Sequence, residues 1–455
     1  MTAFLPSDRR RFLAATGSAF AALAASGCST APSPTAMVPR ASAGRGAVGY
    51  GPLVEDPAGM LDLPAGFTYR VLSRLGNAMS DGGTVPDKAD GMGCLDLGGG
   101  RIALVRNHEL VPTDAAGATL ASGYGTREGQ VVPGGTTTLV LDGATLAVEQ
   151  EYRSLAGTIR NCSGGVTPWG SWLTCEEAPT GPGQRYGEGL AKNHGWVFEV
   201  PAAAGRQVEA VPLTAMGRFN HEAACVDPRT GIVYLTEDRD DSMLYRFLPT
   251  RPGDLAAGGR LQAMVALDGS TDSRNWPGTD YQGPRMQVHA PKAVKWIDLD
   301  DVEAPEDDLR LRAAARGGML IARGEGIHMG EGELYVCSTS GGAKKLGQVF
   351  RLVPGYNGAA DRFELFFESE REEQFNYGDN LTVAPFGDLI VCEDQYTDPV
   401  DNYLRGITPA GEAYPFGRLR MQTELAGGCF SPDGKWFFVN AYSPTVTVAI
   451  TGPWT

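Results

Sequence analysis

The sequence lacks the cysteine spacings on which zinc fingers and complete disulfide frameworks depend. It has eight cysteines and no CxxC pair, at positions 28, 94, 162, 175, 225, 337, 392 and 429. Without Cys28 the number is odd, so at least one thiol is unpaired. Cys337 in LYVCSTS and Cys392 in LIVCEDQ lie within apolar runs. We therefore expect these two to be small buried side chains.

No apolar run of membrane-spanning length follows the first 28 residues. Basic residues are fewer than acidic ones. The chain has 54 acidic against 39 basic residues, a formal net charge of −15. This balance disfavours nucleic acid as a partner and favours the binding of divalent cations.

The first residues have the pattern of an export signal. Residues 7–28, SDRRRFLAATGSAFAALAASGC, place an arginine cluster before an Ala-rich apolar segment that is too short to span a bilayer. This pattern predicts twin-arginine export and a periplasmic or extracellular location. Twin-arginine signals carry folded proteins, often with a bound cofactor. Gly27-Cys28 resembles the end of a lipoprotein cleavage site. Lipidation of Cys28 is therefore left open, and it is the only membrane attachment that the sequence suggests.

We divide the chain into three segments: a signal at 1–28, a linker at 29–52 and one domain at 53–455. The linker is rich in Ser, Ala, Pro and Gly and has little to bury. The remaining length suits two or more domains, or one closed all-β architecture. We expect a single domain and a monomer.

A hairpin pattern recurs six times along the predicted domain. Each copy has a polar start, a short strand, a turn with glycine, a second apolar strand and a polar ending. The turn glycines are residues 100, 170, 231, 332, 387 and 434. Regular hairpins with abundant glycine predict an all-β fold, a six-bladed β-propeller with inserted loops. One charged segment, Asp298 to Arg316, is the expected short helix.

Acidic residues gather at both ends of these hairpins, and antiparallel pairing returns both ends to the same side. The strand starts supply Asp90, Cys162, Glu222, Glu325 and Asp379; the strand ends supply Glu109, Glu176, Glu177, Glu237, Asp238, Glu393 and Asp394. So many carboxylates at one mouth of a propeller would repel one another unless cations neutralise them. A single acid of this kind is more often a solvated rim residue, but their recurrence favours a metal site.

The ligand types indicate which metals. Carboxylates suit Ca²⁺, whereas a thiolate among carboxylates suits iron better. Cys162 lies beside glycines at a strand start and is the expected thiolate ligand. Cys175 lies within the apolar strand SWLTC and is expected to be structural. His221 precedes Glu222 and is a weaker candidate, as are Asp90, Glu109, Glu237 and Asp394.

Several motifs resemble those of the PhoX family of alkaline phosphatases: NCSGGVTPWGSWLTCEE, GRFNHEAACVDPRTGIVYLTEDRDDSMLYRFLP, ARGEG, STSGGAKKLGQVFRL, GDNLTVAPFGDLIVCED, GGCFSPDGKWFFVN and ITGPW. The resemblance spans about Asp90 to Trp454. It implies a six-bladed propeller, twin-arginine export and hydrolysis of phosphomonoesters at a cluster of Fe³⁺ and Ca²⁺. It further implies metal ligation by Cys162, Glu177, Glu222, Glu325 and Asp379, and phosphate binding by Arg323. Glu176, from the strand ends named above, is a further candidate metal ligand.

Two other functions stay open. A calcium-dependent lactonase on a six-bladed propeller would also place acids at a channel mouth, without needing Cys162. A non-enzymatic periplasmic propeller would hold calcium for stability alone. Iron together with calcium would indicate the phosphatase, whereas calcium alone would fit either alternative.

Overall fold

The computed structural model describes residues 48–278 and 283–454. The predicted export signal and most of the predicted linker lie outside these residues. The first strand, β1, covers Leu53–Val54, where the domain was expected to begin. Tyr50 precedes it and is already packed, since its ring centroid lies 4.8 Å from that of Phe67. The folded part therefore includes the last residues of the predicted linker.

Six antiparallel hairpins form at the six predicted repeats. Their first strands are β4 (Ala89–Gly98), β10 (Asn161–Val166), β13 (His221–Val226), β20 (Gly324–Met329), β24 (Gly378–Val383) and β28 (Leu425–Phe430). Their second strands are β5 (Arg101–His108), β11 (Ser171–Glu176), β14 (Val233–Glu237), β21 (Leu334–Ser338), β25 (Leu389–Glu393) and β29 (Phe437–Ala441).

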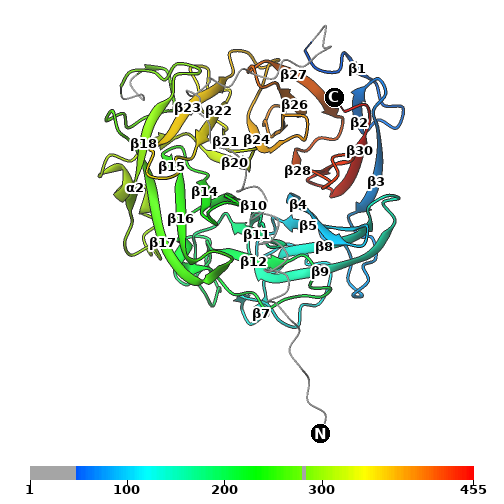
Figure 1. Cartoon of the computed structure of the whole chain (residues 1–455). Coiled ribbons are helices and arrows are strands. Elements are labelled where there is room, and N and C mark those ends of the chain that lie inside the picture. Colours follow the sequence, from blue (N-terminus) through cyan, green and yellow to red (C-terminus); the bar gives the residue numbers. More distant parts are fainter. Residues whose placement is uncertain (1–47, 279–282, 455) are drawn as a thin grey trace, which may run out of the picture. The chain divides into compact units, whose positions relative to one another are not determined.

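The first strands of these hairpins form the innermost layer of a propeller (Figure 1). They contact one another in circular order: β4 with β10, then β13, β20, β24 and β28, which returns to β4. We call them the inner strands. The predicted all-β propeller is confirmed. The six inner strands of the described chain belong to five sheets, because one nine-stranded sheet contains both β13 and β20. The count of six blades stays a prediction.

Further strands extend each hairpin outward. They are β8 (Gly134–Asp142), β9 (Val148–Thr158), β12 (Val197–Pro201), β16 (Tyr245–Arg251), β17 (Asp254–Ala266), β18 (Lys292–Asp298), β22 (Gln348–Val353), β23 (Asp361–Glu368), β26 (Tyr403–Ile407) and β27 (Ala413–Leu419). Short strands are β2 (Leu61–Pro64), β6 (Thr126–Arg127), β7 (Gln130–Val131), β15 (Ser242–Met243) and β19 (Leu320–Ile321).

The ring is closed by an early segment of the chain. Strand β3 (Thr68–Arg74) pairs antiparallel with the last strand, β30 (Val446–Thr451), and completes the sheet that begins with β28. This pairing joins residues almost 400 positions apart, and it removes the exposed edge that β30 would otherwise present.

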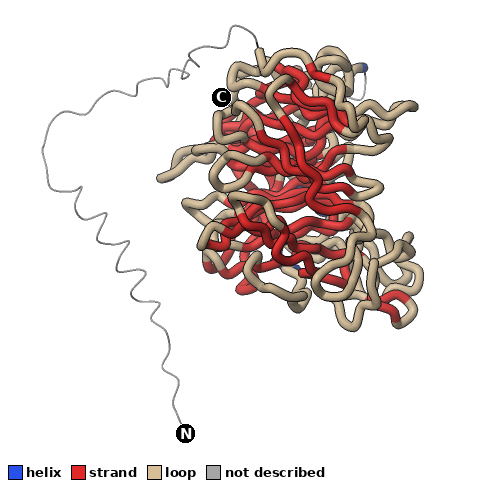
Figure 2. The backbone as a smooth tube through the Cα atoms, turned by 90° about the vertical axis from the view of Figure 1, so that its right-hand side faces the viewer, coloured by secondary structure: helices blue, strands red, loops and turns tan. Residues whose placement is uncertain are grey.

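The hydrophobic core lies between neighbouring sheets, because each strand alternates the faces that it presents to them. In one cluster, Leu173 and Cys175 from β11 join Val233 and Leu235 from β14. Cys175, Cys337 and Cys392 are fully buried, which confirms the expectation that they pack as small apolar side chains. Figure 2 shows that strands make up most of the described chain, with loops at their ends.

The predicted helix is much shorter than expected. Strand β18 runs to Asp298, and the α-helix α2 covers only Leu309–Ala314. Between them, three residues have left-handed backbone conformations, at Asp301, Ala304 and Asp307. These conformations interrupt a right-handed helix. No helix in the described part of the chain has the length and apolar character needed to cross a membrane.

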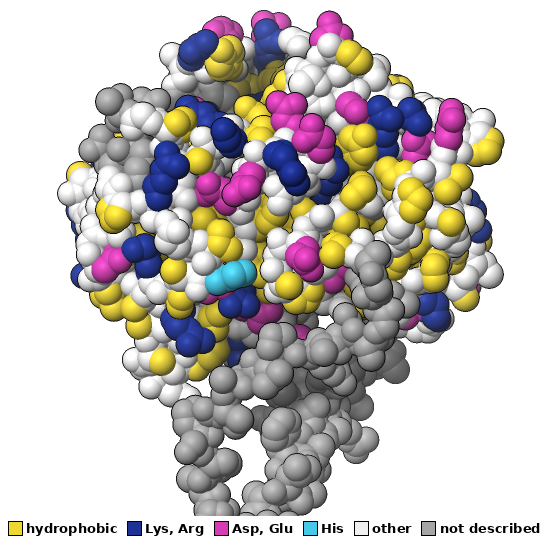
Figure 3. Space-filling model, turned by 90° about the horizontal axis from the view of Figure 1, so that it is seen from above, with side chains coloured by type: hydrophobic (Ala, Val, Ile, Leu, Met, Phe, Trp, Pro, Cys, Tyr) yellow, Lys and Arg dark blue, Asp and Glu magenta, His cyan; other side chains and the backbone are white. Residues whose placement is uncertain are grey.

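Acidic and basic side chains are interspersed over the outer face in Figure 3. On that face the acidic excess of the chain is not gathered into one patch.

Candidate metal centre

The second residue of an inner strand occupies the same place in each hairpin, which we call the second position. Five hairpins supply a candidate ligand there, in the order Asp90, Cys162, Glu222, Glu325 and Asp379, and the sixth supplies Ala426. A register shift follows the start of every inner strand, for example between Asn161 and Gly164. Such bulges re-aim side chains. The structure therefore repeats one ligand geometry around the ring.

A second equivalent place lies directly after the second strand of each hairpin, and we call it the exit position. Its backbone N–H donates to the carbonyl of the residue that precedes the inner strand, as Glu177 does to Arg160 at 2.8 Å. The exit residues are Glu109, Glu177, Asp238, Thr339, Asp394 and Tyr442. Four of these six are acidic and lie at the same end of the ring as the second position.

The residue that accepts this hydrogen bond holds the third place, the entry position. The entry residues are Lys88, Arg160, Asn220, Arg323, Tyr377 and Glu424. Four of them have positive φ angles: 54° at Lys88, 45° at Arg160, 50° at Arg323 and 55° at Tyr377. Left-handed conformations are costly for residues other than glycine and concentrate at functional sites. Both arginines at this end of the hairpins therefore occupy equivalent, strained positions.

Side chains from all three positions converge into three groups. Cys162, Glu177 and Glu222 form the first; Glu222, Glu325 and Asp379 form the second; Asp379, Asp394 and Glu424 form the third. Within each group one potential ligand atom per residue lies within 4.8 Å of the others. Because Glu222 and Asp379 are each shared by two groups, the three groups form one continuous cluster.

Cys162 lies among the carboxylates of this cluster. Its Sγ is 3.2 Å from Glu222 Oε1 and 3.6 Å from Asp90 Oδ2. Cys162 is buried and is not in a disulfide. The structure thus brings the weaker candidate Asp90 beside the predicted thiolate.

The charge balance of the cluster favours bound cations. Burial raises the pKa values of Asp90, Cys162, Glu222 and Glu325 well above their usual ranges, and neighbouring acids raise them further. Asp90 Oδ1 and Glu222 Oε2 are buried without a hydrogen-bond partner. Buried polar atoms normally have partners. The donor set and these two oxygens fit metal ions, which would neutralise the acids and hold Cys162 as a thiolate.

Two arginines border the cluster. Arg323 donates to both oxygens of Asp238, at 2.8 and 3.2 Å, and to Glu325 Oε1 at 2.9 Å. Arg160 donates from Nε to Glu109 Oε1 at 2.7 Å and from Nη2 to Glu177 Oε2 at 2.5 Å. Each guanidinium therefore joins an exit-position acid of the ring to a second carboxylate.

Glu176 is not brought into the cluster. It is the last residue of β11, paired with Asn161, and it faces away from its neighbour Glu177. Its carboxylate accepts hydrogen bonds from the amides of Ile159, Gly195 and Trp196 and contacts His194 Nδ1 at 2.6 Å. These contacts give Glu176 a structural environment instead of a place among the ligand groups.

Glu237 and His221 also lie outside the three groups. Glu237 ends β14 and accepts a hydrogen bond from the Tyr245 hydroxyl at 2.8 Å. His221 Nε2 lies 2.9 Å from the Gly217 carbonyl, and its ring stacks on Phe219 with centroids 3.6 Å apart. Burial lowers the pKa of His221 to about 3. A neutral, stacked histidine of this kind supports the fold around Glu222.

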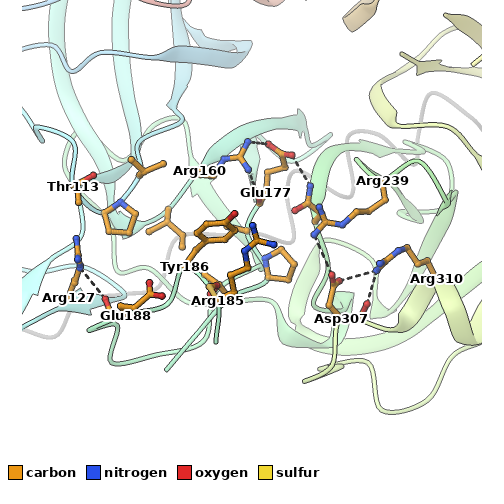
Figure 4. A pocket seen from close by; sticks show the side chains of 17 residues that line it. Thr113, Arg127, Arg160, Glu177, Arg185, Tyr186, Glu188, Arg239, Asp307 and Arg310 are labelled. Atoms are coloured by element: carbon orange, nitrogen blue, oxygen red, sulfur yellow. Dashed lines mark hydrogen bonds and ion pairs between the residues drawn. The ribbon is translucent and has the colours of Figure 1, made fainter. Parts of the chain in front are cut away.

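A cavity of about 950 Å³ opens beside the cluster. Glu177, Arg160 and Asn220 are among the residues that line it, and Figure 4 shows Arg160 beside Glu177. Asn220 Nδ2 donates to Glu177 Oε1 at 2.7 Å. Tyr186, whose exposed fraction is 69%, also lines it. Arg323 is not among its lining residues.

The sequence prediction missed Arg160, Asn220 and Glu424. The signal that could have found them is positional, since all three precede an inner strand by one residue, as Arg323 does. Only Glu424 of these is acidic, and it precedes the one hairpin whose second position is not a ligand.

Fold and site together define a β-propeller with a buried acid and thiol cluster at one end of its inner strands. The chain belongs to the PhoX alkaline phosphatase family, whose model, described as "Alkaline phosphatase PhoX", matches residues 48–145 and 143–445. The predicted family is thereby confirmed, and it places the chain among phosphatases.

Among solved structures the fold is similar to that of Pseudomonas fluorescens PhoX in complex with vanadate, a transition state analogue. The identity is 19%, the match covers 86% of this chain and 96% of that chain, and the TM-score is 0.65. A gluconolactonase of Xanthomonas campestris matches at 14% identity and a TM-score of 0.42, over 89% of this chain and 99% of that one. A search of curated proteins gave no match.

Proposed function

We propose that the protein is an exported alkaline phosphatase that hydrolyses phosphomonoesters at an iron and calcium cluster in the propeller mouth. Membership of the phosphatase family supports the reaction. The single structural observation that carries the proposal is the continuous cluster in which one buried thiol, Cys162, lies among buried carboxylates.

The ligand types indicate which metal each of the three groups would bind. The group that contains Cys162 suits iron better than calcium, because thiolate ligates transition metals whereas calcium takes oxygen ligands. The two groups made only of carboxylates suit Ca²⁺. When bound, such metals neutralise charge on the phosphoryl oxygens and activate the attacking oxygen.

The chain's own residues position the substrate. Asp238 fixes the Arg323 guanidinium through two hydrogen bonds, so the side chain is held in place before the substrate arrives. Guanidinium groups bind phosphate through paired N–H donors. Arg323 would therefore orient the phosphoryl group over the cluster. Arg323 cannot ligate a cation, since it has donors and no acceptor.

The predicted twin-arginine signal supports export to the periplasm or beyond, with the lipid on Cys28 as a further proposal. The proposed binding partner is a phosphomonoester substrate. The acidic net charge disfavours nucleic acid. We propose that the protein is a monomer.

The alternatives make different demands on the residues. A calcium-dependent lactonase or a non-enzymatic calcium propeller needs acids but has no use for a thiol among them. Cys162 therefore favours the phosphatase. The test is metal content measured together with hydrolysis of a generic phosphomonoester by the purified protein. Iron and calcium with hydrolysis are expected, whereas calcium alone without hydrolysis would refute the proposal.

A further inference from the structure

The cavity beside the cluster contains an arginine to which the family resemblance gives no role. Arg160 and Arg323 both hold the entry position of their hairpins, each immediately before an inner strand. Their carbonyls accept equivalent backbone hydrogen bonds, from Glu177 at 2.8 Å and from Thr339 at 3.0 Å. Their φ angles differ by only a few degrees, at 45° and 50°. The fold thus presents two guanidinium groups to the cluster from different hairpins in the same way.

Access differs between the two arginines. The exposed fraction of the Arg160 side chain is 40%, against 22% for Arg323. Arg160 lines the cavity of about 950 Å³, together with Glu177, whereas Arg323 does not. Figure 4 shows the Arg160 guanidinium beside Glu177 above Tyr186. A substrate that reaches the cluster through this cavity would meet Arg160 before Arg323.

Arg160 has hydrogen-bonding capacity to spare. Its Nε and Nη2 donate to Glu109 and Glu177, while Nη1 makes one long bond of 3.3 Å to the Glu177 carbonyl. A guanidinium has five N–H donors, two of them on Nη1. At least one Nη1 donor therefore has no partner among the described residues. The two carboxylates hold the guanidinium in place and leave this Nη1 donor available for a ligand.

The geometry points to Arg160 as a second phosphate-binding residue and to this cavity as the route by which the phosphomonoester enters. This inference rests on the proposed function. Arg323 would hold the phosphoryl group from one side of the cluster, and Arg160 would contact it from the cavity side. The apolar lining around Val111, Pro112 and Pro179 would then face the organic part of the ester.

The competing role for Arg160 is structural: it would only neutralise Glu109 and Glu177. Two variants separate the roles. Arg160→Ala removes charge and donors, and Arg160→Lys keeps the charge but loses the paired geometry. Both are compared with Arg260→Ala, which removes an exposed arginine that pairs with Asp298 at 2.9 Å, away from the cluster.

The measurements are iron and calcium content and competitive inhibition by inorganic phosphate. We expect Arg160→Lys to keep its metals and to bind phosphate about tenfold or more weakly, as loss of a charge-assisted contact implies. Arg160→Ala should show at least the same loss, and Arg260→Ala none. Unchanged inhibition in Arg160→Lys would overturn the inference, as would loss of metal from both Arg160 variants. A wild-type protein without hydrolysis or phosphate binding would refute the proposed function itself.

Discussion

Glu176 and Glu177 are neighbours in the sequence and face opposite environments. Glu176 accepts three backbone N–H groups and contacts His194, all within the fold. Glu177 points to the cluster, where Asn220 and Arg160 hold its two oxygens. Successive side chains along a strand point to opposite faces, so the two neighbouring carboxylates lie on opposite sides of the backbone.

The pair provides a matched test of the site. Glu176→Ala should lower the free energy of unfolding by about 2–4 kcal/mol, because buried backbone donors lose their acceptor, and should keep its metals. Glu177→Ala should lose bound metal and activity with less effect on the metal-free fold. Urea unfolding of metal-free protein and elemental analysis measure both. Metal loss from the Glu176 variant alone would reverse the two assignments.

Removal of calcium should abolish hydrolysis and lower the melting temperature. Without cations, the buried carboxylates of the three groups repel one another. A metal whose free concentration is one hundred times its Kd stabilises the folded state by about 2.7 kcal/mol. Calorimetry and activity before and after chelation test this, with calcium added back as control. A chelated protein with full activity would contradict it.

Arg323→Ala should impair phosphate recognition and leave the metals bound. Arginine donates hydrogen bonds and cannot ligate a cation. We expect a raised KM and weaker inhibition by phosphate, by about tenfold or more. Elemental analysis of the same sample is the control. If the variant lost its metals, Arg323 would instead be needed to assemble the cluster.

Metal binding to the metal-free protein should strengthen with rising pH. Burial raises the pKa of Glu177 to about 8 and that of Asp379 to about 7. Below these values the carboxyls carry protons that a metal must displace, so binding weakens as pH falls, by about tenfold per pH unit for each proton displaced. Calcium titrations at pH 6 and pH 9, in buffers of different ionisation enthalpy, measure affinity and proton release. Equal affinity at both values would show that these carboxyls bind no metal.

The six hairpins were predictable because their signals are local. A turn glycine such as Gly170, with φ of 89°, lies between two short apolar strands and needs no distant partner to be recognised. The same locality explains why second-position residues such as Cys162 and Glu325 could be named in advance. Each begins an inner strand in its own repeat.

Other features depend on contacts that local patterns do not encode. The choice between Glu176 and Glu177 follows from strand register. Glu424 joins the third group because of its entry position, although its repeat has Ala426 where the others have a ligand. The expected helix from Asp298 to Arg316 is shortened because β18 pairs with β17 as far as Asp298 and because the residues that follow include left-handed conformations. In each of these cases the surrounding fold overrides the local pattern.

The most direct measurement is the visible spectrum and iron content of Cys162→Ser beside those of wild type and Cys175→Ala. A thiolate bound to ferric iron should give a charge-transfer band, so wild-type protein should be coloured. Cys162→Ser should lose the colour with much of its activity. Cys175→Ala should keep both and lose about 1 kcal/mol or more of stability, because a fully buried side chain is truncated. A Cys162→Ser protein that stayed coloured with its full iron content would contradict the thiolate ligand at the centre of this account.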